Sequence, residues 1–286
     1  KAILPFLASS VVGLLSHSNL VSAAGFSLIE QGVKGLGNAY AGSAAVAEDA
    51  TTVFFNPAGM TRLQGSQVVL AGHVIMPSAK FSNGNSVVGA AALTGGDGGE
   101  GGENAFAPNF YYVSDVGNGL KFGLGVSAPF GLVTEYDNDW KGRYHAIRSD
   151  LMTININPSI AYPVNSQLSL GAGINAQYAE AELTNAADLR YIATGGASTA
   201  QDGDAIANVE GDDWGYGFNL GLLYEIDKPT RLGVAYRSKV KQTLEGTATF
   251  TPTNATATAL LAAIRGGTGN LVDTSARGSR LPLSKS

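Results

Sequence analysis

Apolar and polar residues alternate along several long stretches of the chain, as expected of β-strands with one face of each kind. The clearest stretch is Leu151–Tyr162, where the even positions are Met, Ile, Ile, Pro, Ile and Tyr and the odd ones are Thr, Asn, Asn, Ser and Ala. Residues 168–178 and 214–226 repeat the pattern. We therefore predict an all-β protein with strands at about 66–81, 104–114, 119–134, 145–162, 167–184, 212–226 and 231–250, and an eighth beginning near Asp273.

The apolar faces of these strands have the features of surfaces that contact lipid. Each of the three clearest strands is long enough to cross a bilayer at a tilt. The apolar rows end in aromatic residues such as Tyr162, Tyr178 and Trp214, as an interfacial girdle does. The opposite rows consist of Gly, Asn, Ser and Thr, which are too small and neutral for an ordinary charged surface. The pattern predicts a transmembrane antiparallel β-barrel with a polar lumen.

The connections between the predicted strands alternate between short and long. The short ones are 114–119, 163–167 and 227–230, and the long ones are 82–103, 135–144, 185–210 and 251–273. Outer-membrane barrels have short periplasmic turns and long extracellular loops, so the chain is predicted to lie in the outer membrane of a Gram-negative bacterium. Within the last long loop, residues 254–265 form an amphipathic pattern that predicts a short helix.

Composition narrows the choice of function classes. Of 286 residues 14% are charged, 38 are Gly, none is Cys, and the net charge is −5. Disulfides and thiolate chemistry are excluded, and the charge argues against nucleic acid as a partner. No apolar run is long enough for a transmembrane helix. Residues 1–23 are predicted to be an incomplete secretory signal peptide, the alternative being an amphipathic first helix.

Candidate catalytic chemistry is sparse. His17, His73 and His145 show no Ser-Asp partner pattern, and Gly35–Gly42 lacks the preceding strand and the Lys of a phosphate loop. The acidic residues of the Gly95–Gly102 region and Glu103 are expected to be solvated, with a calcium site as the alternative. The sequence predicts no enzyme, no cofactor and no metal.

A short stretch before the first strand, Asn56-Pro57-Ala58, combines a turn signal with a residue that can begin a helical turn. It lies in Ala24–Leu63, which resembles the N-terminal hatch of the FadL family of outer-membrane transporters of hydrophobic compounds. Residues 129–136, 140–151 and 212–241 continue this resemblance in order. Family barrels have fourteen strands, so the resemblance implies a small helical hatch at 24–65 and, at 66–286, a barrel of which about seven to eight strands are present.

The resemblance implies passive uptake of hydrophobic compounds, long-chain fatty acids first, with exit sideways through the barrel wall. Ala24, Gly25 and Phe26 are then expected to bind ligand, Asn56, Pro57 and Ala58 to gate it, and Pro129, Phe130 and Gly131 to form the lateral kink. A basic lumen residue of the fatty-acid members falls on Asn185, with Arg190 nearby, which leaves neutral aromatic hydrocarbons as an alternative ligand.

A structural or adhesive barrel without transport remains a further alternative. The expected partners are a hydrophobic small molecule and outer-membrane lipid, with the protein as a monomer. Because eight strands enclose only side chains, the chain is expected to be a fragment or a frameshifted product that does not transport by itself.

Overall fold

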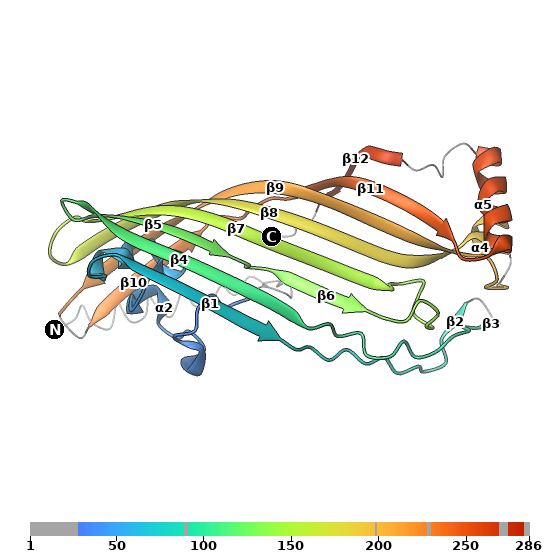
Figure 1. The fold of residues 1–286 in the computed structure, drawn as a ribbon, viewed down its shortest axis with the longest axis horizontal. Helices are drawn as coiled ribbons and strands as arrows, with labels where there is room; N and C mark the ends of the chain where they lie inside the picture. Colours follow the sequence, from blue (N-terminus) through green and yellow to red (C-terminus); the bar gives the residue numbers. More distant parts are fainter. Residues whose placement is uncertain (1–27, 89–90, 198, 228–229, 269–273, 283–286) are drawn as a thin grey trace, which may run out of the picture.

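A computed structural model describes residues 28–88, 91–197, 199–227, 230–268 and 274–282. Its framework is one curved antiparallel sheet (Figure 1). The strands are β1 (Gln67–Ile75), β2 (Val87–Val88), β3 (Ala91–Ala92), β4 (Ala105–Gly117), β5 (Leu120–Ser127), β6 (Gly131–Glu135), β7 (Arg148–Pro163), β8 (Leu168–Asp188), β9 (Asp204–Glu225), β10 (Arg231–Arg237), β11 (Thr243–Pro252) and β12 (Thr274–Pro282).

The helices gather at the two ends of the strands. Near the tight turns lie η1 (Leu36–Asn38), α2 (Ser43–Val46), α3 (Thr52–Phe55) and η2 (Pro57–Arg62). At the opposite end, α4 (Leu189–Ala193) packs on α5 (Ala255–Thr268) through buried Leu189 and Leu261 (Figure 1). Among the described residues, no helix combines the length and the apolar character needed to cross a bilayer. The short helix predicted in the last loop is confirmed by α5.

The main sheet runs in the order β1-β4-β5-β7-β8-β9-β11-β12, with β6 paired to β7 and β10 paired to β9. Its apolar row faces outward: Ile160 is 54% exposed, whereas the intervening Asn157 and Ser159 are buried. This is the reverse of a soluble protein and fits the predicted contact with lipid. From Met152 to Tyr162 the row covers ~33 Å of strand, which at a tilt of ~40° spans ~25 Å, the height of a barrel's apolar band.

Two of the predicted strands are interrupted, and each interruption contains one extra residue. Between β5 and β6, three residues (128–130) stand opposite two residues of β7, because Ser127 pairs with Asn155 and Gly131 with Met152. Between β10 and β11 the seven residues 238–244 stand opposite six of β9. Both interruptions are bulges, and across each one the inward-facing positions switch between odd-numbered and even-numbered residues.

Several strand boundaries differ from the sequence prediction, and the first predicted strand, 66–81, ends already at Ile75. The predicted loop 185–210 is wrong, since β8 continues to Asp188 and β9 begins at Asp204, and the predicted continuous strand 231–250 is wrong because of the second bulge. Alanines and acidic residues of 204–213 keep alternating inside the ladder, with Ala205 and Ala207 buried and the neighbours less so. Because the inward-facing residues of this extension are small, its alternation was too weak for the sequence to indicate a strand.

Residues 28–63, called the hatch below, lie on the inner face of the sheet at its turn end. They are joined to the wall by a shared apolar core, which consists of Ala50, Val53, Met60, Leu63, Tyr111, Val113 and Ala161. Polar contacts supplement this core: Arg62 forms an ion pair with Glu225 at 2.8 Å, and Arg231 donates a hydrogen bond to the carbonyl of Val46 at 3.0 Å. The hatch is therefore attached to several strands at once.

Candidate functional site

Asn56 joins three parts of the hatch and wall. It is fully buried, and its side-chain oxygen accepts a hydrogen bond from the N–H of Ala58 at 3.1 Å, which caps η2 with Pro57 in the first turn. Its amide nitrogen donates to the carbonyls of Ala44 in α2 at 2.6 Å and of Leu222 in β9 at 3.0 Å. The turn signal of Asn56 and the helical turn that begins at Pro57, both predicted from the sequence, are confirmed.

Two paired glycines of the wall form the seat for this turn. Gly171 of β8 and Gly221 of β9 are directly opposite each other in the ladder. A Cβ atom at Gly171 would lie 2.4 Å from the nitrogen of Ala58, and one at Gly221 would lie 2.0 Å from the side-chain oxygen of Asn56. The close approach of the hatch backbone therefore requires glycine at both positions.

Replacing Asn56 is expected to loosen the hatch. Asn56→Ala removes three hydrogen bonds and leaves buried partners unsatisfied, at ~1–3 kcal/mol for each such group. Asn56→Asp keeps the acceptor for Ala58 but places a carboxylate against two carbonyls, so we expect it to be at least as destabilising. Proteolysis of the hatch at increasing urea concentration measures the effect. If the hatch of both variants resists the protease as well as the wild-type hatch does, Asn56 does not hold the hatch to the wall.

The first bulge lies at the position predicted for the lateral kink, with a gap in the wall beside it. β4 and β5 pair up to Phe110 and Val126, and the same register resumes only at the isolated bridge between Gly102 and Thr134. Residues 103–109 and 127–133 lie between, all described and without ladder pairs to each other. Gly131 belongs to β6, so it borders the bulge rather than lying within it.

The hatch fills the lumen side of this gap. The N–H of Leu28 donates to the carbonyl of Pro129 at 3.0 Å. The buried side chain of Gln31 donates to the carbonyl of Ala128 at 3.3 Å, and on the other edge Asn109 donates to the carbonyl of Glu30 at 3.2 Å. Residues 28–31 thus connect the two edges of the wall where the strands do not. Sequence reasoning missed Gln31 and Asn109, which carry no motif.

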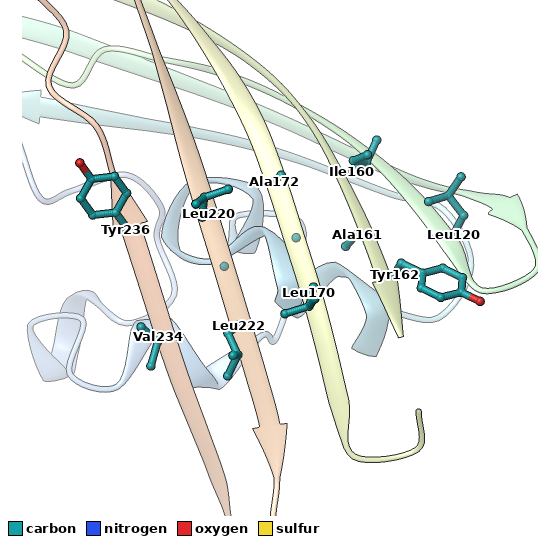
Figure 2. Close-up of a pocket in the computed structure, with 12 residues that line it drawn as sticks. Leu120, Ile160, Ala161, Tyr162, Leu170, Ala172, Leu220, Leu222, Val234 and Tyr236 are labelled. Carbon is teal, nitrogen blue, oxygen red and sulfur yellow. The ribbon is translucent and has the colours of Figure 1, made fainter. Parts of the chain in front are cut away.

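An apolar cavity of about 370 Å³ lies above the hatch, toward the long loops. Its inward-facing side chains include Leu132, Leu151, Leu183, Val209 and Leu244. This volume is within the range of small-molecule sites, roughly 300–1,000 Å³. A second hollow, of about 520 Å³, is formed by outward residues such as Leu170, Leu220 and Tyr236, with the hatch behind the strands (Figure 2). Because it faces outward, it is part of the lipid-contacting surface.

Buried polar residues separate the apolar cavity from the hatch. Asn155, Asn157, Asn175 and Asn219 come from three neighbouring strands and form one hydrogen-bonded group, called the asparagine network below. Three of its polar atoms, the oxygens of Asn155 and Asn157 and the nitrogen of Asn219, have no protein partner. The lumen therefore has an apolar upper part and a polar floor.

The long loops are held together at their base by Arg143. It is 5% exposed, binds Asp204 at 2.8 Å and donates to the carbonyl of Thr94 at 2.7 Å. Tyr144 donates to the same Asp204 at 2.9 Å. Burial, and next this hydrogen bond to a carboxylate, raise the pKa of Tyr144 above its ordinary value, so it remains a neutral donor. Three loops are thus fixed around one buried ion pair.

The acidic loop does not form a metal site in the described part of the chain, where no three acidic or histidine side chains gather. Asp97 pairs with Lys141 at 3.3 Å and Glu100 with Lys80 at 3.8 Å. The pKa of Glu100 is lowered, first by the N–H of Ala79 and then by the hydroxyl of Ser78, which donates at 2.8 Å. These contacts join the loop to residues 78–80, which follow β1, and to Lys141 of the next long loop.

This loop is expected to loosen only in acid. The pKa of Glu100 is lower in the folded than in the unfolded protein. The ionised side chain therefore stabilises the loop fully above the pKa of the unfolded state, and this stabilisation is lost as the pH falls through the pKa of the folded state. Cleavage of Gly95–Gly102 by an acid-stable protease should therefore increase below the ordinary glutamate range. In Glu100→Gln this pH dependence should be absent. A wild-type loop cleaved equally at neutral and acidic pH would refute the linkage.

The other predicted site residues are less informative. Ala24, Gly25 and Phe26 lie outside the described residues, as does the predicted signal peptide, so their roles stay predictions. Asn185 donates to the carbonyls of Ala186 at 3.0 Å and Tyr144 at 3.4 Å. Arg190 lies in α4 and is ion-paired with Asp202, so it does not substitute for a basic lumen residue.

An outward-apolar sheet with a wall gap and an inner hatch defines an outer-membrane β-barrel of the plugged kind. A model of the family described as "Outer membrane protein transport protein (OMPP1/FadL/TodX)" matches residues 14–277, and the chain belongs to this family. Family membership confirms the predicted resemblance, the barrel fold, the outer-membrane location and the prediction that the chain is not an enzyme.

Individual relatives agree with this assignment. The "Long-chain fatty acid transport protein" of Escherichia coli O6:H1 is 33% identical over 236 residues, which cover 78% of this chain and 52% of the relative. "Outer membrane protein P1" of Haemophilus influenzae is 34% identical over 251 residues, covering 77% and 54%. The crystal structure of a Pseudomonas aeruginosa FadL homologue matches with a TM-score of 0.78 and 26% identity, over 87% of this chain and 60% of that one. The chain spans about half the length of the curated relatives it matches.

Proposed function

We propose that this chain takes part in the passive uptake of hydrophobic compounds, with long-chain fatty acids as the first candidates. The gap beside the first bulge, filled on the lumen side by residues 28–31, is the observation that carries the proposal. A wall of this kind gives an apolar ligand a way into lipid that avoids water. The ligand itself and the surrounding outer-membrane lipid are the proposed partners, with the protein as a monomer.

In the proposed mechanism, a ligand enters from the long loops and binds in the cavity lined by Leu151, Leu183 and Leu244. Burial stabilises it by ~0.8 kcal/mol per methylene, so a long acyl chain leaves slowly unless the site changes. Movement of the hatch around Asn56, Pro57 and Ala58 would draw residues 28–31 away from the gap. The ligand then passes between residues 103–109 and 127–133, down its concentration gradient.

Ligand binding tests this proposal directly. The purified protein, as its gene encodes it, is titrated in detergent with a long-chain fatty acid and with a neutral aromatic of similar size, and Asn56→Ala is measured beside the wild type. Binding of the acid alone supports fatty-acid uptake, and binding of the aromatic alone supports hydrocarbon uptake. The second outcome is favoured by position 185, where Asn stands in place of a basic residue. Binding of neither compound would favour a structural barrel.

A further inference from the structure

Arg237 connects the hatch to the second bulge and to the asparagine network. It is the last residue of β10, and its side chain crosses the inner face of the sheet. One terminal nitrogen donates to the carbonyl of Phe54 in α3 at 2.8 Å, and the guanidinium lies 4.4 Å from the centre of the Phe54 ring. The other terminal nitrogen donates to Asn175. A single side chain thus holds the hatch helix and the polar floor together.

This guanidinium has only neutral partners. Among the residues that the structure describes, no carboxylate forms an ion pair with Arg237, whereas seven other arginines and lysines of the wall and loops have one, including Arg143, Arg148 and Arg231. Arg237 is partly buried, and withdrawing a cation from water without an anion is costly, so a neutral side chain of similar size would fill the same space at lower cost. The charge therefore calls for a role other than packing.

The surroundings of Arg237 match one kind of molecule. The asparagine network at its side supplies further N–H donors, and the nitrogen of Asn219 has no protein partner. Asn155 in this network lies four residues along β7 from Leu151 of the apolar cavity, a separation of ~13 Å. A ligand with a long apolar tail and one anionic group can thus fill the cavity and reach the polar floor.

The position of Arg237 next to a bulge makes its side chain able to change partners. Residues 238–242, directly after it, lie outside the strands, and of these Ser238 still exchanges hydrogen bonds with Phe218 of β9. Phe54, which it holds, lies two residues before Asn56 in the chain. Release of Phe54 would therefore free the helix that leads into the turn seated on Gly171 and Gly221.

We propose that Arg237 is a latch that responds to the ligand. In the empty barrel it holds α3 through Phe54, and the carboxylate of a bound ligand competes for the guanidinium and so releases the hatch. No covalent step is involved, since a hydrogen bond from the guanidinium to a carboxylate replaces a weaker one to the neutral carbonyl of Phe54. The inference rests on the proposed function and adds a trigger to it: an anionic ligand opens the hatch and a neutral one of equal length does not.

The test measures exposure of a buried hatch position. Because the chain has no cysteine, Ala50→Cys introduces a single thiol at a position that is fully buried. Its rate of reaction with a maleimide is measured in detergent with oleate, with methyl oleate and with neither. We expect oleate to raise the rate by about tenfold, the factor expected for one hydrogen bond to a charged group, and methyl oleate to leave it unchanged.

Variants separate the latch from a general loss of packing. Arg237→Gln is expected to react fast with or without oleate, and Arg237→Lys, which keeps the charge, to recover part of the oleate response. Lys239→Gln removes the same charge from an exposed side chain two residues away and should behave like the wild type. Circular dichroism checks that each variant keeps its strands.

Direct binding of both lipids, measured in parallel, keeps the latch distinct from the proposed function. If both lipids bind and accelerate labelling equally, or if Arg237→Gln is labelled as slowly as the wild type, the latch is refuted and the uptake proposal stands. If neither lipid binds the wild type, the latch and fatty-acid uptake both fail, and the titration with the aromatic decides on hydrocarbon uptake.

Discussion

Deletion of Pro129 is expected to abolish lateral exit while leaving ligand binding intact. Residues 128–130 place three residues opposite two of β7, so removing one lets β5 and β6 share one register with β7 as a continuous strand. A ligand without a side exit must cross water at ~0.8 kcal/mol per methylene, so uptake of a long chain should fall by at least about a hundredfold. Uptake into cells and binding to purified protein measure the two effects separately.

Pro129→Ala is the matched control for this deletion. It removes the ring but keeps the number of residues, and therefore keeps the bulge. We expect its uptake to be close to wild type. If the deletion variant transports normally, or if the alanine variant fails to the same degree, the register change is not what opens the wall.

Gly221→Val is expected to displace the hatch. Even a Cβ atom would lie 2.0 Å from the side-chain oxygen of Asn56 and 3.0 Å from the nitrogen of Ala58, so the turn has to move off β9. Overpacking of this kind costs ~1–3 kcal/mol, and here it acts on the contact between hatch and wall. The variant should admit small hydrophilic solutes and lose hatch resistance to protease.

Gly84→Val is a suitable control for the glycine substitution, because no atom lies within 4 Å of its Cβ position. It should retain a closed, protease-resistant hatch. Solute exclusion by Gly221→Val equal to that of the wild type would show that the hatch is not the barrier.

The sequence predicted the strands in which apolar and polar residues alternate regularly. It was less informative where an extra residue switches the face of the sheet on which the apolar residues lie. Alternation from Leu151 to Tyr162 correctly indicated an inverted strand, and Pro129 marked the first bulge. The second bulge has a weaker signal, a polar run from Arg237 to Thr243 in which alternation stops. No Gly, Pro, Asn or Asp stands there, so the run was interpreted as part of one strand.

The lumen contacts were the least predictable part of the site. Asn56 was found because Asn-Pro has local turn chemistry. Gly171 and Gly221 belong to a polar row of many similar residues, and only the position of the hatch shows which glycines are indispensable. Gln31, Asn109 and Arg237 each form a hydrogen bond to a residue at least 79 positions away in the chain. Contacts of that sequence separation have no local pattern.

The two bulges also bear on the geometry of the barrel as a whole. The diameter and strand tilt of a closed barrel follow from the number of strands and from the cumulative stagger between them, its shear. The first bulge puts its extra residue in the strand before β7, and the second puts its extra residue in the strand after β9. The two changes of stagger therefore have opposite signs and cancel, so the sheet from β5 to β11 keeps the same cumulative stagger around the hatch and around the apolar cavity, and one wall width serves both.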